Sequence, residues 1–225
     1  MVDSVNIIEL KEYILDSRMT GRPFERFDFS LAREDVCVLS ADSIDDGLTF
    51  LKALATLTRP LHGIYRYNGD ILNLSDYSGL LSVKKKIGFI TSHSALISNR
   101  TIRENLLLAG SYFNNTIFME LDEKTRELCE LFSIQKMIDQ RPSDLSARDC
   151  HLAITIRELA KSPEILLLEH PEDFIGLANF GILWDFLAKF VKEKLPVVFL
   201  SNSKSFIQSF SNRKLVIMQG TLTEG

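Results

Sequence analysis

Three short apolar runs predict buried strands of an α/β core. Val36–Leu39, Ile165–Leu168 and Val197–Leu200 are continuous apolar stretches rich in branched residues, and such runs are typical of parallel strands that are covered on both faces. A polar loop over Ser40–Gly47 follows the first run, and apolar residues at helical spacing then predict a helix over Leu48–Leu57. Strand, loop and helix in this order predict the opening unit of an α/β fold.

The later part of the chain repeats this pattern. Helical spacing over Phe180–Lys194 predicts a helix that connects the second and third strands, which makes a β-α-β crossover. Leu215–Met218 and the following Gln219-Gly220 predict one strand and the turn of a closing hairpin. The middle of the chain, about 91–144, is dominated by helical patterns such as Glu123–Phe132 and lacks convincing strand runs. We therefore expect a mostly helical insertion in an α/β core.

Length and composition fit one globular domain. The 225 residues are 45% hydrophobic and 25% charged, which allows a single domain over 1–225, with 1–90 and 145–225 as the core and about 91–144 as the helical part. The net charge of −4 gives no global reason to expect nucleic-acid binding, and we interpret Lys84–Lys86 as a solvated rim. The three cysteines, Cys37, Cys129 and Cys150, show no zinc spacing and favour a reduced compartment.

The same composition argues against direct membrane insertion. Apolar runs in this chain are only about five or six residues long, whereas a spanning helix needs about 20. Met1–Leu10 carries Asp3 and Glu9 and lacks the charged and apolar regions of a leader, so we expect no signal peptide. Any contact with a membrane is therefore expected to come through a partner.

Several segments, in order, resemble the ATP-binding subunits of ABC transporters. They match the turn and strand after the first helix, the Q-loop and its helix, the signature segment and the Walker B strand. The matching segments are Arg59–Gly63 with Asn68–Ile71, Ile87–Phe89 with Ala95–Ile97 and Thr101–Asn105, Arg141–Ser146 with Arg157–Ala160, and Pro163–Pro171. The resemblance implies a P-loop NTPase-like ABC ATPase fold with a mainly parallel sheet, an N-terminal antiparallel β portion and an inserted α-helical subdomain.

The phosphate loop of the resembling family is replaced. A working loop reads G-x-x-x-x-G-K-[ST], in which glycines expose N–H groups to phosphate, lysine neutralises charge and the hydroxyl holds magnesium. In register, the chain has Ala41, Asp42, Ser43, Ile44, Asp45, Asp46, Gly47 and Leu48. A like-charge contact at about 4 Å costs roughly 4 kcal/mol at an effective dielectric near 20. We interpret the aspartates as helix caps and expect no ATP or magnesium as a cofactor of this chain.

The other catalytic positions differ as well. The resemblance places Ser92 at the Q-loop glutamine, Glu169 and His170 at the Asp-Glu pair that ends Walker B, Gly176 at the aspartate of the following loop, and Asn202 at the switch histidine. His170 could act as a general base, or it could simply fill the old catalytic position. Phosphoryl transfer depends almost wholly on positioning and electrostatic stabilisation. The sequence therefore predicts a pseudo-ATPase without catalytic residues or a metal site.

Two surfaces are expected to meet partners. The resemblance implies head-to-tail pairing, in which the signature segment faces the nucleotide of the second cassette; Ser146 is kept, whereas Ala147 and Arg148 replace glycines. Arg148 could contact a partner's phosphate, form a salt bridge across the dimer or face solvent. The resemblance also implies that the surface beside the Q-loop receives a helix of the membrane subunit. Its members here are Ser92, His93, Ala95, Leu96 and Ile97, which could alternatively be core residues.

The resembling family stacks an aromatic side chain near the amino terminus on the adenine base. Tyr13 is the candidate for this aromatic side chain in the resembling family.

We expect an accessory subunit of an ABC transport complex. It would lie on the cytoplasmic face of the inner membrane, docked on a permease and paired with a second, active ATPase as a heterodimer. Ala95–Asn99 and Arg141–Ser146 are most similar to bacterial lipid-transport cassettes of the MCE (Mla) type. One alternative is a soluble homodimeric scaffold in which Asp42, Asp45 and Asp46 face Arg148 of a second copy. Another is a residual nucleotide enzyme that uses Glu169 and His170.

Overall fold

A four-stranded antiparallel sheet forms one layer of the protein. The computed structural model describes residues 6–16, 21–114 and 120–225. Within this part of the chain the sheet has the order β2-β1-β4-β5, with β1 over Asn6–Ile14, β2 over Phe27–Ala32, β4 over His62–Tyr67 and β5 over Asp70–Ile71. Alternate side chains of β2 are buried, as expected for a sheet with one face on a core and one face on solvent.

A six-stranded, mainly parallel sheet forms the second layer, with the order β10-β9-β3-β8-β7-β6. Its strands are β3 (Val36–Ala41), β6 (Ile87–Ile90), β7 (Ile165–Glu169), β8 (Val197–Leu200), β9 (Arg213–Met218) and β10 (Thr221–Glu224). All pairs are parallel except the β9–β10 hairpin. Strands β7 and β8 are buried at every position, which explains their continuous apolar sequences.

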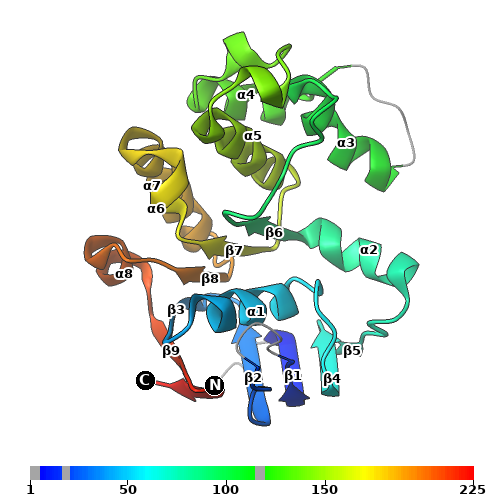
Figure 1. The fold of residues 1–225 in the computed structure, drawn as a ribbon, viewed down its shortest axis with the longest axis vertical. Coiled ribbons are helices and arrows are strands. Elements are labelled where there is room, and N and C mark those ends of the chain that lie inside the picture. The colour runs from blue at the N-terminus through cyan, green and yellow to red at the C-terminus, as the bar shows by residue number, and fades with distance from the viewer. Residues whose placement is uncertain (1–5, 17–20, 115–119) are drawn as a thin grey trace.

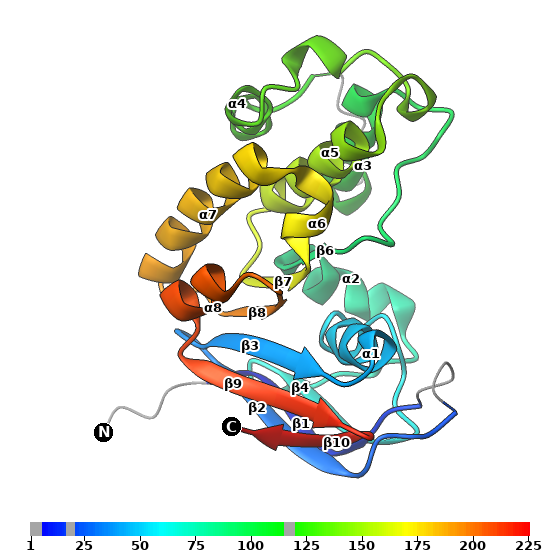
Figure 2. The same ribbon diagram turned by 60° about the vertical axis from the view of Figure 1, so that its left-hand side comes forward.

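Helices cover this sheet and extend from it. They are α1 (Ile44–Leu54), α2 (Tyr77–Lys86), α3 (Ile102–Asn114), α4 (Glu123–Leu131), α5 (Ala147–Ala160), α6 (Pro171–Ile175), α7 (Leu177–Lys192) and α8 (Lys204–Phe210), with short 3-10 turns over Gln135–Met137 and Pro142–Asp144. Helices α3, α4 and α5 lie together at one end of the molecule, and the antiparallel sheet lies at the other (Figure 1). Figure 2 shows α6 and α7 between these two ends, beside the parallel sheet.

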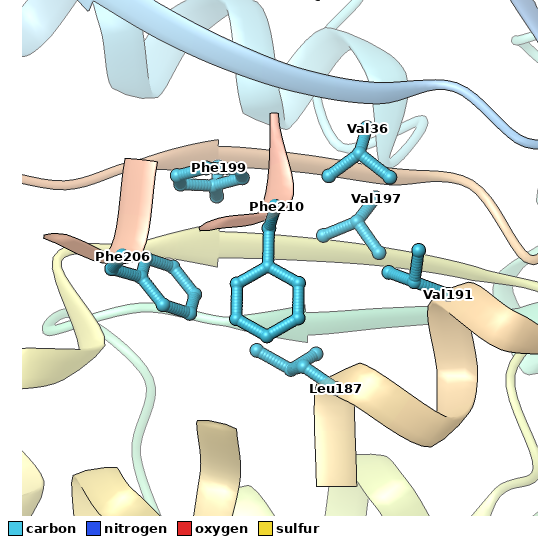
Figure 3. Close-up of a pocket in the computed structure, with 7 residues that line it drawn as sticks. All are labelled: Val36, Leu187, Val191, Val197, Phe199, Phe206 and Phe210. Atoms are coloured by element: carbon cyan, nitrogen blue, oxygen red, sulfur yellow. The ribbon is translucent and has the colours of Figure 1, made fainter. Parts of the chain in front are cut away.

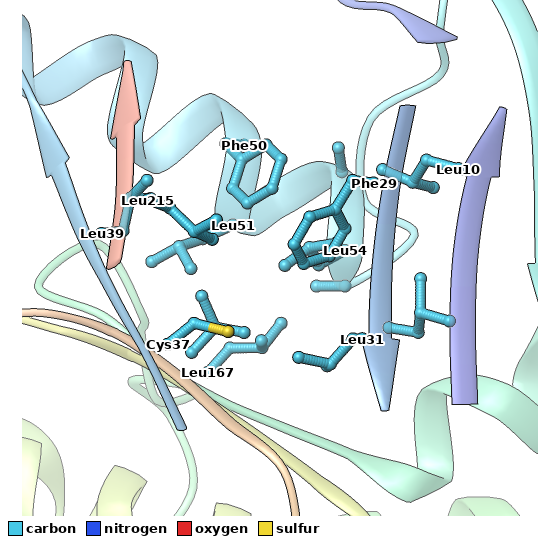
Figure 4. Packing of buried hydrophobic residues seen from close by; sticks show 14 of the residues in the cluster. Leu10, Phe29, Leu31, Cys37, Leu39, Phe50, Leu51, Leu54, Leu167 and Leu215 are labelled. Atoms are coloured by element: carbon cyan, nitrogen blue, oxygen red, sulfur yellow. The ribbon is translucent and has the colours of Figure 1, made fainter. Parts of the chain in front are cut away.

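Two apolar cores hold the layers together. The first lies between the two sheets and includes one face of α1, where Phe50, Leu51 and Leu54 meet residues of both sheets (Figure 4). Cys37 lies in this core, and burial raises the pKa of its thiol to about 12. The second core lies between the parallel sheet and helices α3 to α8. The carboxyl ends of the parallel strands lie next to α1, α6 and the loop before α8. The residues at the catalytic positions of the resembling family lie at these ends.

The observed elements correct several predicted boundaries. Helix α1 begins at Ile44 and ends at Leu54, so the loop predicted over Ser40–Gly47 is wrong. Its acidic first turn interacts favourably with the helix dipole, which supports the earlier start. Helix α7 spans Leu177–Lys192. It begins three residues before the predicted start at Phe180. Between β6 and β7 the described residues form helices and turns, as predicted, and α5 extends this helical part beyond residue 144.

Gly63 tests how closely β4 approaches β1. Its φ is +113°, and a Cβ there would lie 2.7 Å from Tyr13 Cα and 2.8 Å from Glu12 O. Gly63→Ala is expected to lower the free energy of unfolding by more than about 3 kcal/mol, because steric overlap adds to about 1–3 kcal/mol of backbone strain. Gly69→Ala is the matched control: its φ is +87° with open space around the new Cβ, so only the strain applies. Equal urea-unfolding losses for the two variants would contradict the close approach.

Candidate functional site

The phosphate-loop position is a two-residue link between a strand and a helix. Strand β3 ends at Ala41 and α1 begins at Ile44, so only Asp42 and Ser43 lie between them. The Gly47 amide donates to Ser43 O over 3.2 Å inside the first turn. A loop that wraps a phosphate needs several free amides that point to one centre. Here the segment that would supply these amides, residues 41–48, is helical from Ile44 onward.

The three aspartates of this segment lie at two places, one at the end of β3 and two in the first turn of α1. The Asp42 side chain accepts a hydrogen bond from the Gln219 amide at 2.9 Å, which ties the end of β3 to the β9–β10 turn. Ser43 occupies the N-cap, and its side chain makes no capping bond with the described residues. Asp45 and Asp46 lie in the first turn, where a carboxylate favours the helix dipole. The N-cap residue is thus Ser43, and Asp45 and Asp46 favour the helix start from its first turn.

The lysine and hydroxyl positions face the protein interior. Gly47 is buried, and a Cβ there would lie 3.1 and 3.2 Å from the two methyl carbons of Leu200. Such contacts are tighter than ordinary van der Waals distances, so a longer side chain would have to displace Leu200. Leu48 has 4% of its surface exposed. The two positions that would contact phosphate and magnesium in a working loop are therefore parts of a packed interface.

The Walker B and Q-loop positions bond directly to each other. Glu169 is 3% exposed at the end of β7. Its Oε2 accepts hydrogen bonds from both the amide and the hydroxyl of Ser92, each over 3.0 Å. A buried carboxylate needs such partners, because leaving it unpaired is costly. The carboxylate that would face magnesium through water instead fixes the start of the Q-loop.

A second carboxylate, missed in the sequence, joins α6 to the loop after β8. Glu172 Oε1 accepts from the Ser201 hydroxyl at 2.7 Å and from the Asn202 amide at 2.6 Å. Burial alone would raise the pKa of Glu172, but interactions with His170, Ser201 and the Asn202 amide lower it to about 2. The sequence signal was an acid in the first turn of a helix that starts at Pro171. The switch position, Asn202, is therefore held by its backbone.

His170 lies beside this carboxylate in a left-handed backbone conformation, with φ 41° and ψ 53°. Its Nδ1 is buried and has no hydrogen-bond partner among the described residues, and it lies 3.9 Å from Glu172 Oε1, which is ion-pair distance. Glu172 raises the pKa of His170, and burial opposes this shift. A ring held beside its own counter-ion fits the structural interpretation of His170 better than the general-base one.

The signature segment begins helix α5. Ser146 is the N-cap, and its Oγ accepts from the Asp149 amide at 3.2 Å and donates to the Asp149 carboxylate at 2.6 Å. Ala147 and Arg148 follow in the first turn and are exposed. The Arg148 side chain lies over Gly176, where a Cβ would be 3.2 Å from Arg148 Nε. The structure thus brings the signature position and the Gly176 position together within one chain.

The segment expected to dock on a membrane subunit is only partly exposed. His93, Ala95 and Ile97 are exposed, and Leu96 packs partly against the second core. Asn105, which sequence reasoning missed, is 1% exposed and shapes the segment. It accepts from the Ile97 amide at 2.7 Å and donates to Ile97 O and Thr101 O. The sequence signal for this residue was an asparagine side chain among the apolar residues of α3.

Tyr13 cannot be the base-stacking aromatic. It is fully buried, and its ring packs edge-on against Phe27 with centroids 5.9 Å apart. Burial raises the pKa of its hydroxyl well above the usual value. The pairing of β1 with β2 is irregular between Leu10 and Tyr13, and both side chains lie in the first core, where a nucleotide base cannot reach Tyr13.

An apolar crevice lies away from these residues, between α7, α8 and the ends of β3 and β8 (Figure 3). It is lined by Val36, Leu187, Val191, Val197, Phe199, Phe206 and Phe210. Such a lining offers no donor to a phosphate, so we interpret the crevice as a packing seam of the second core.

The described part of the chain has neither a metal cluster nor a membrane span. No three His, Cys, Asp or Glu side chains in it are grouped to hold a metal ion. The expected absence of a bound metal nevertheless stays a prediction. None of the described helices combines the length and apolar character needed to cross a membrane.

Known proteins resemble this chain over most of its length. No family model matches it. The molybdate/tungstate import ATP-binding protein WtpC of Archaeoglobus fulgidus is 27% identical over 199 residues, which cover 88% of this chain and 79% of that protein. The glutamine transport ATP-binding protein GlnQ of Bacillus subtilis is 22% identical over 200 residues, covering 89% and 82%.

Solved structures agree on the fold. The dimeric structure of a bacterial ABC transporter cassette superposes with a TM-score of 0.82 at 19% identity and covers 97% of both chains. A post-hydrolysis state of an ATP-binding cassette bound to ADP and Pi gives 0.81 at 18% identity. The predicted fold class, with an antiparallel N-terminal sheet, a mainly parallel sheet and a helical portion, is confirmed. The chain is thus similar over most of its length to ATP-binding proteins of ABC transporters, and it shares the fold of ABC transporter cassettes.

Replacing Glu172 tests the link between α6 and the loop after β8. Its lowered pKa means that its contribution to stability is present above its ordinary pKa of 4.5 and is lost as the pH falls towards about 2. The raised pKa of His170 adds stability below its ordinary value of 6.5, which is lost as the pH rises through the folded-state pKa. Both contributions are therefore present between 4.5 and 6.5.

Glu172→Gln is expected to lower the free energy of unfolding by about 1.5–3 kcal/mol near pH ~5.5, the range for hydrogen bonds to charged groups. The loss should shrink towards both acidic and alkaline pH. Urea unfolding across this range measures it, with Glu127→Gln on the exposed face of α4 as the control. A loss that does not vary with pH would argue against the His170–Glu172 pair.

Proposed function

We propose that this chain is a non-hydrolysing cassette subunit of an ABC transporter complex. The observation that carries the proposal is the two-residue link between β3 and α1, which replaces the loop that would wrap a phosphate. Gly47, at the lysine position, packs against Leu200, and Leu48, at the magnesium-ligand position, is buried. The residues present do not fit a magnesium-bound triphosphate, so we assign no chemical step to this site.

Electrostatics support the same proposal. Asp42, Asp45 and Asp46 surround the helix start, and no lysine stands at the charge-neutralising position. The attraction of a helix amino terminus for an anion is about 0.3–1 kcal/mol and reaches about 2 kcal/mol in favourable cases, whereas like-charge contacts oppose it by several kcal/mol. The other groups that would position a reaction, Glu169 and Asn202, already bond within the chain.

A role in transport fits the exposed part of the Q-loop segment. The relatives WtpC and GlnQ are named as import and transport ATP-binding proteins, and we propose that this chain likewise works as a transporter subunit. Its Ala95 and Ile97 are exposed beside the buried Asn105, so a permease helix could cover them. The chain would thereby lie on the cytoplasmic face of a membrane through its partner.

A second cassette is the other proposed partner. Leu177 is 87% exposed immediately after Gly176, and Ile44 is 71% exposed at the start of α1. Large apolar side chains at both places favour a surface that another protein covers. We propose an active ATPase as that cassette, so that hydrolysis is confined to its site. The finer proposal of lipid transport of the MCE type depends on Ala95–Asn99 and Arg141–Ser146.

Calorimetry tests the loss of nucleotide binding. Titration of the isolated chain with millimolar ATP and magnesium is expected to give no saturable heat. The double variant Gly47→Lys with Leu48→Ser is expected to give none either, because the helical link remains and the new Cβ at position 47 crowds Leu200. Saturable binding by the natural chain would contradict the proposal and would favour the residual-enzyme alternative.

Two exposed apolar residues test the permease contact. Ile97 beside the Q-loop and Leu131 on α4 have the same exposed fraction, 46%. Ile97→Asp is expected to reduce recovery of a permease with this chain from native membranes by about tenfold or more, which corresponds to about 1.4 kcal/mol of lost affinity. Leu131→Asp should leave recovery unchanged.

Mass spectrometry identifies the recovered proteins, and two results would contradict the proposal. One is recovery of the natural chain with neither a permease nor a second cassette. The other is a homodimer in solution that weakens as salt rises, which would favour the soluble scaffold.

A further inference from the structure

The edge of the parallel sheet is covered by side chains of α5. Strand β6 is the last strand of its sheet, so its outer backbone groups have no neighbouring strand to bond. Lys161 Nζ donates to Ile87 O at 3.0 Å, and the Glu158 carboxylate accepts from the Phe89 amide at 3.2 Å. Glu158 lies in the last turn of α5, and Lys161, three positions on, is the C-cap residue of the same helix, so the two side chains are neighbours. Two charged side chains thus take the place of a seventh strand.

The same helix bonds the segment that follows β6. His151 Nε2 lies 3.2 Å from Ser92 O, and Arg157 Nη1 donates to Ala95 O at 3.1 Å. Together with the bonds to Ile87 and Phe89, side chains of α5 contact four backbone groups spread over nine residues. Backbone contacts constrain the path of the chain more directly than contacts between flexible side chains.

Each of these side chains is itself held in place. Glu158 is 7% exposed and lies 2.5 Å from Lys161 Nζ and 3.3 Å from Arg157 Nε. The His151 ring packs on Phe174 with centroids 4.7 Å apart, and its Nδ1 lies 2.8 Å from Ala147 O. A buried charge surrounded in this way is expensive to separate from its partners.

Ser92 is fixed from its other side as well. Its amide and hydroxyl donate to Glu169 at the end of β7, while its carbonyl faces His151. The residue therefore lies between a strand of the core and the longest helix of the helical part. It cannot shift with one of these elements without breaking bonds to the other.

We propose that α5 clamps residues 87–95 in one position relative to the core, with or without nucleotide. The segment that ends at Ala95 and leads to Ile97 is thereby presented to a partner in a fixed geometry. Only this use in docking depends on the proposed transport function; the clamp is a property of the isolated chain.

Amide hydrogen exchange on the isolated natural chain tests the clamp. The Phe89 and Ser92 amides are expected to exchange as slowly as those of buried β3, and millimolar Mg-ATP should not change their rates. Exchange at the rate of exposed turns, or a change at residues 87–95 on adding Mg-ATP, would overturn the proposal. A change confined to residues 41–48 would instead contradict the proposed loss of nucleotide binding, so the two failures are distinguishable.

A double variant probes the side chains directly. His151→Phe keeps an aromatic ring on Phe174 but loses both ring nitrogens, and Arg157→Met keeps an apolar stem but loses the bond to Ala95. Together they are expected to speed exchange at Ser92 and its neighbours about 5- to 30-fold, the factor for 1–2 kcal/mol, while β3 stays protected. Arg126→Met on α4, an exposed arginine, is the control and should change nothing there.

Selective loosening supports the clamp, and unchanged exchange at residues 87–95 in the double variant overturns it. If the double variant loses protection throughout the chain, the measurements on the natural chain decide, since they need no substitution.

Discussion

The contact between Gly47 and Leu200 governs how the first strand passes into the first helix. Because Gly47 has no side chain, the first turn of α1 can lie against the end of β8, and helical hydrogen bonding can begin at Ser43. A wrapping loop would have to lift this turn away from Leu200. The packed first turn therefore leaves the amides of the helix amino terminus surrounded by aspartates, which repel polyanions.

Several polar residues near this contact interact with other segments of the chain. Glu169 bonds Ser92, Glu172 bonds the loop of Asn202, and Arg148 lies over Gly176. Each of these interactions joins two segments that are distant in the sequence. Hydrogen bonds of this kind within the chain stabilise one arrangement of these residues.

The order of elements could be predicted from the sequence, because continuous apolar strands are visible in it, and the replaced motif residues could be read directly. The start of α1 could not be predicted from the sequence. Gly47 is typical of a turn, and only the structure shows that it packs against Leu200. The prediction that Tyr13 stacks on a base failed for a similar reason. An aromatic residue on a strand can face the core or the solvent, and the register of β1 places Tyr13 in the core. The place of Glu172 in the first turn of a helix could be read from the sequence, but the partners of Glu172 and His151 are distant in sequence and no local pattern reveals them.

The central claim is that residues 41–48 form a strand end and a helix start instead of a phosphate-binding loop. The most direct test is an experimental structure of the chain determined in millimolar ATP and magnesium. The account predicts α1 beginning at Ile44, Gly47 against Leu200, and no nucleotide density beside Ser43. Ordered Mg-ATP within an opened turn at these residues would contradict it.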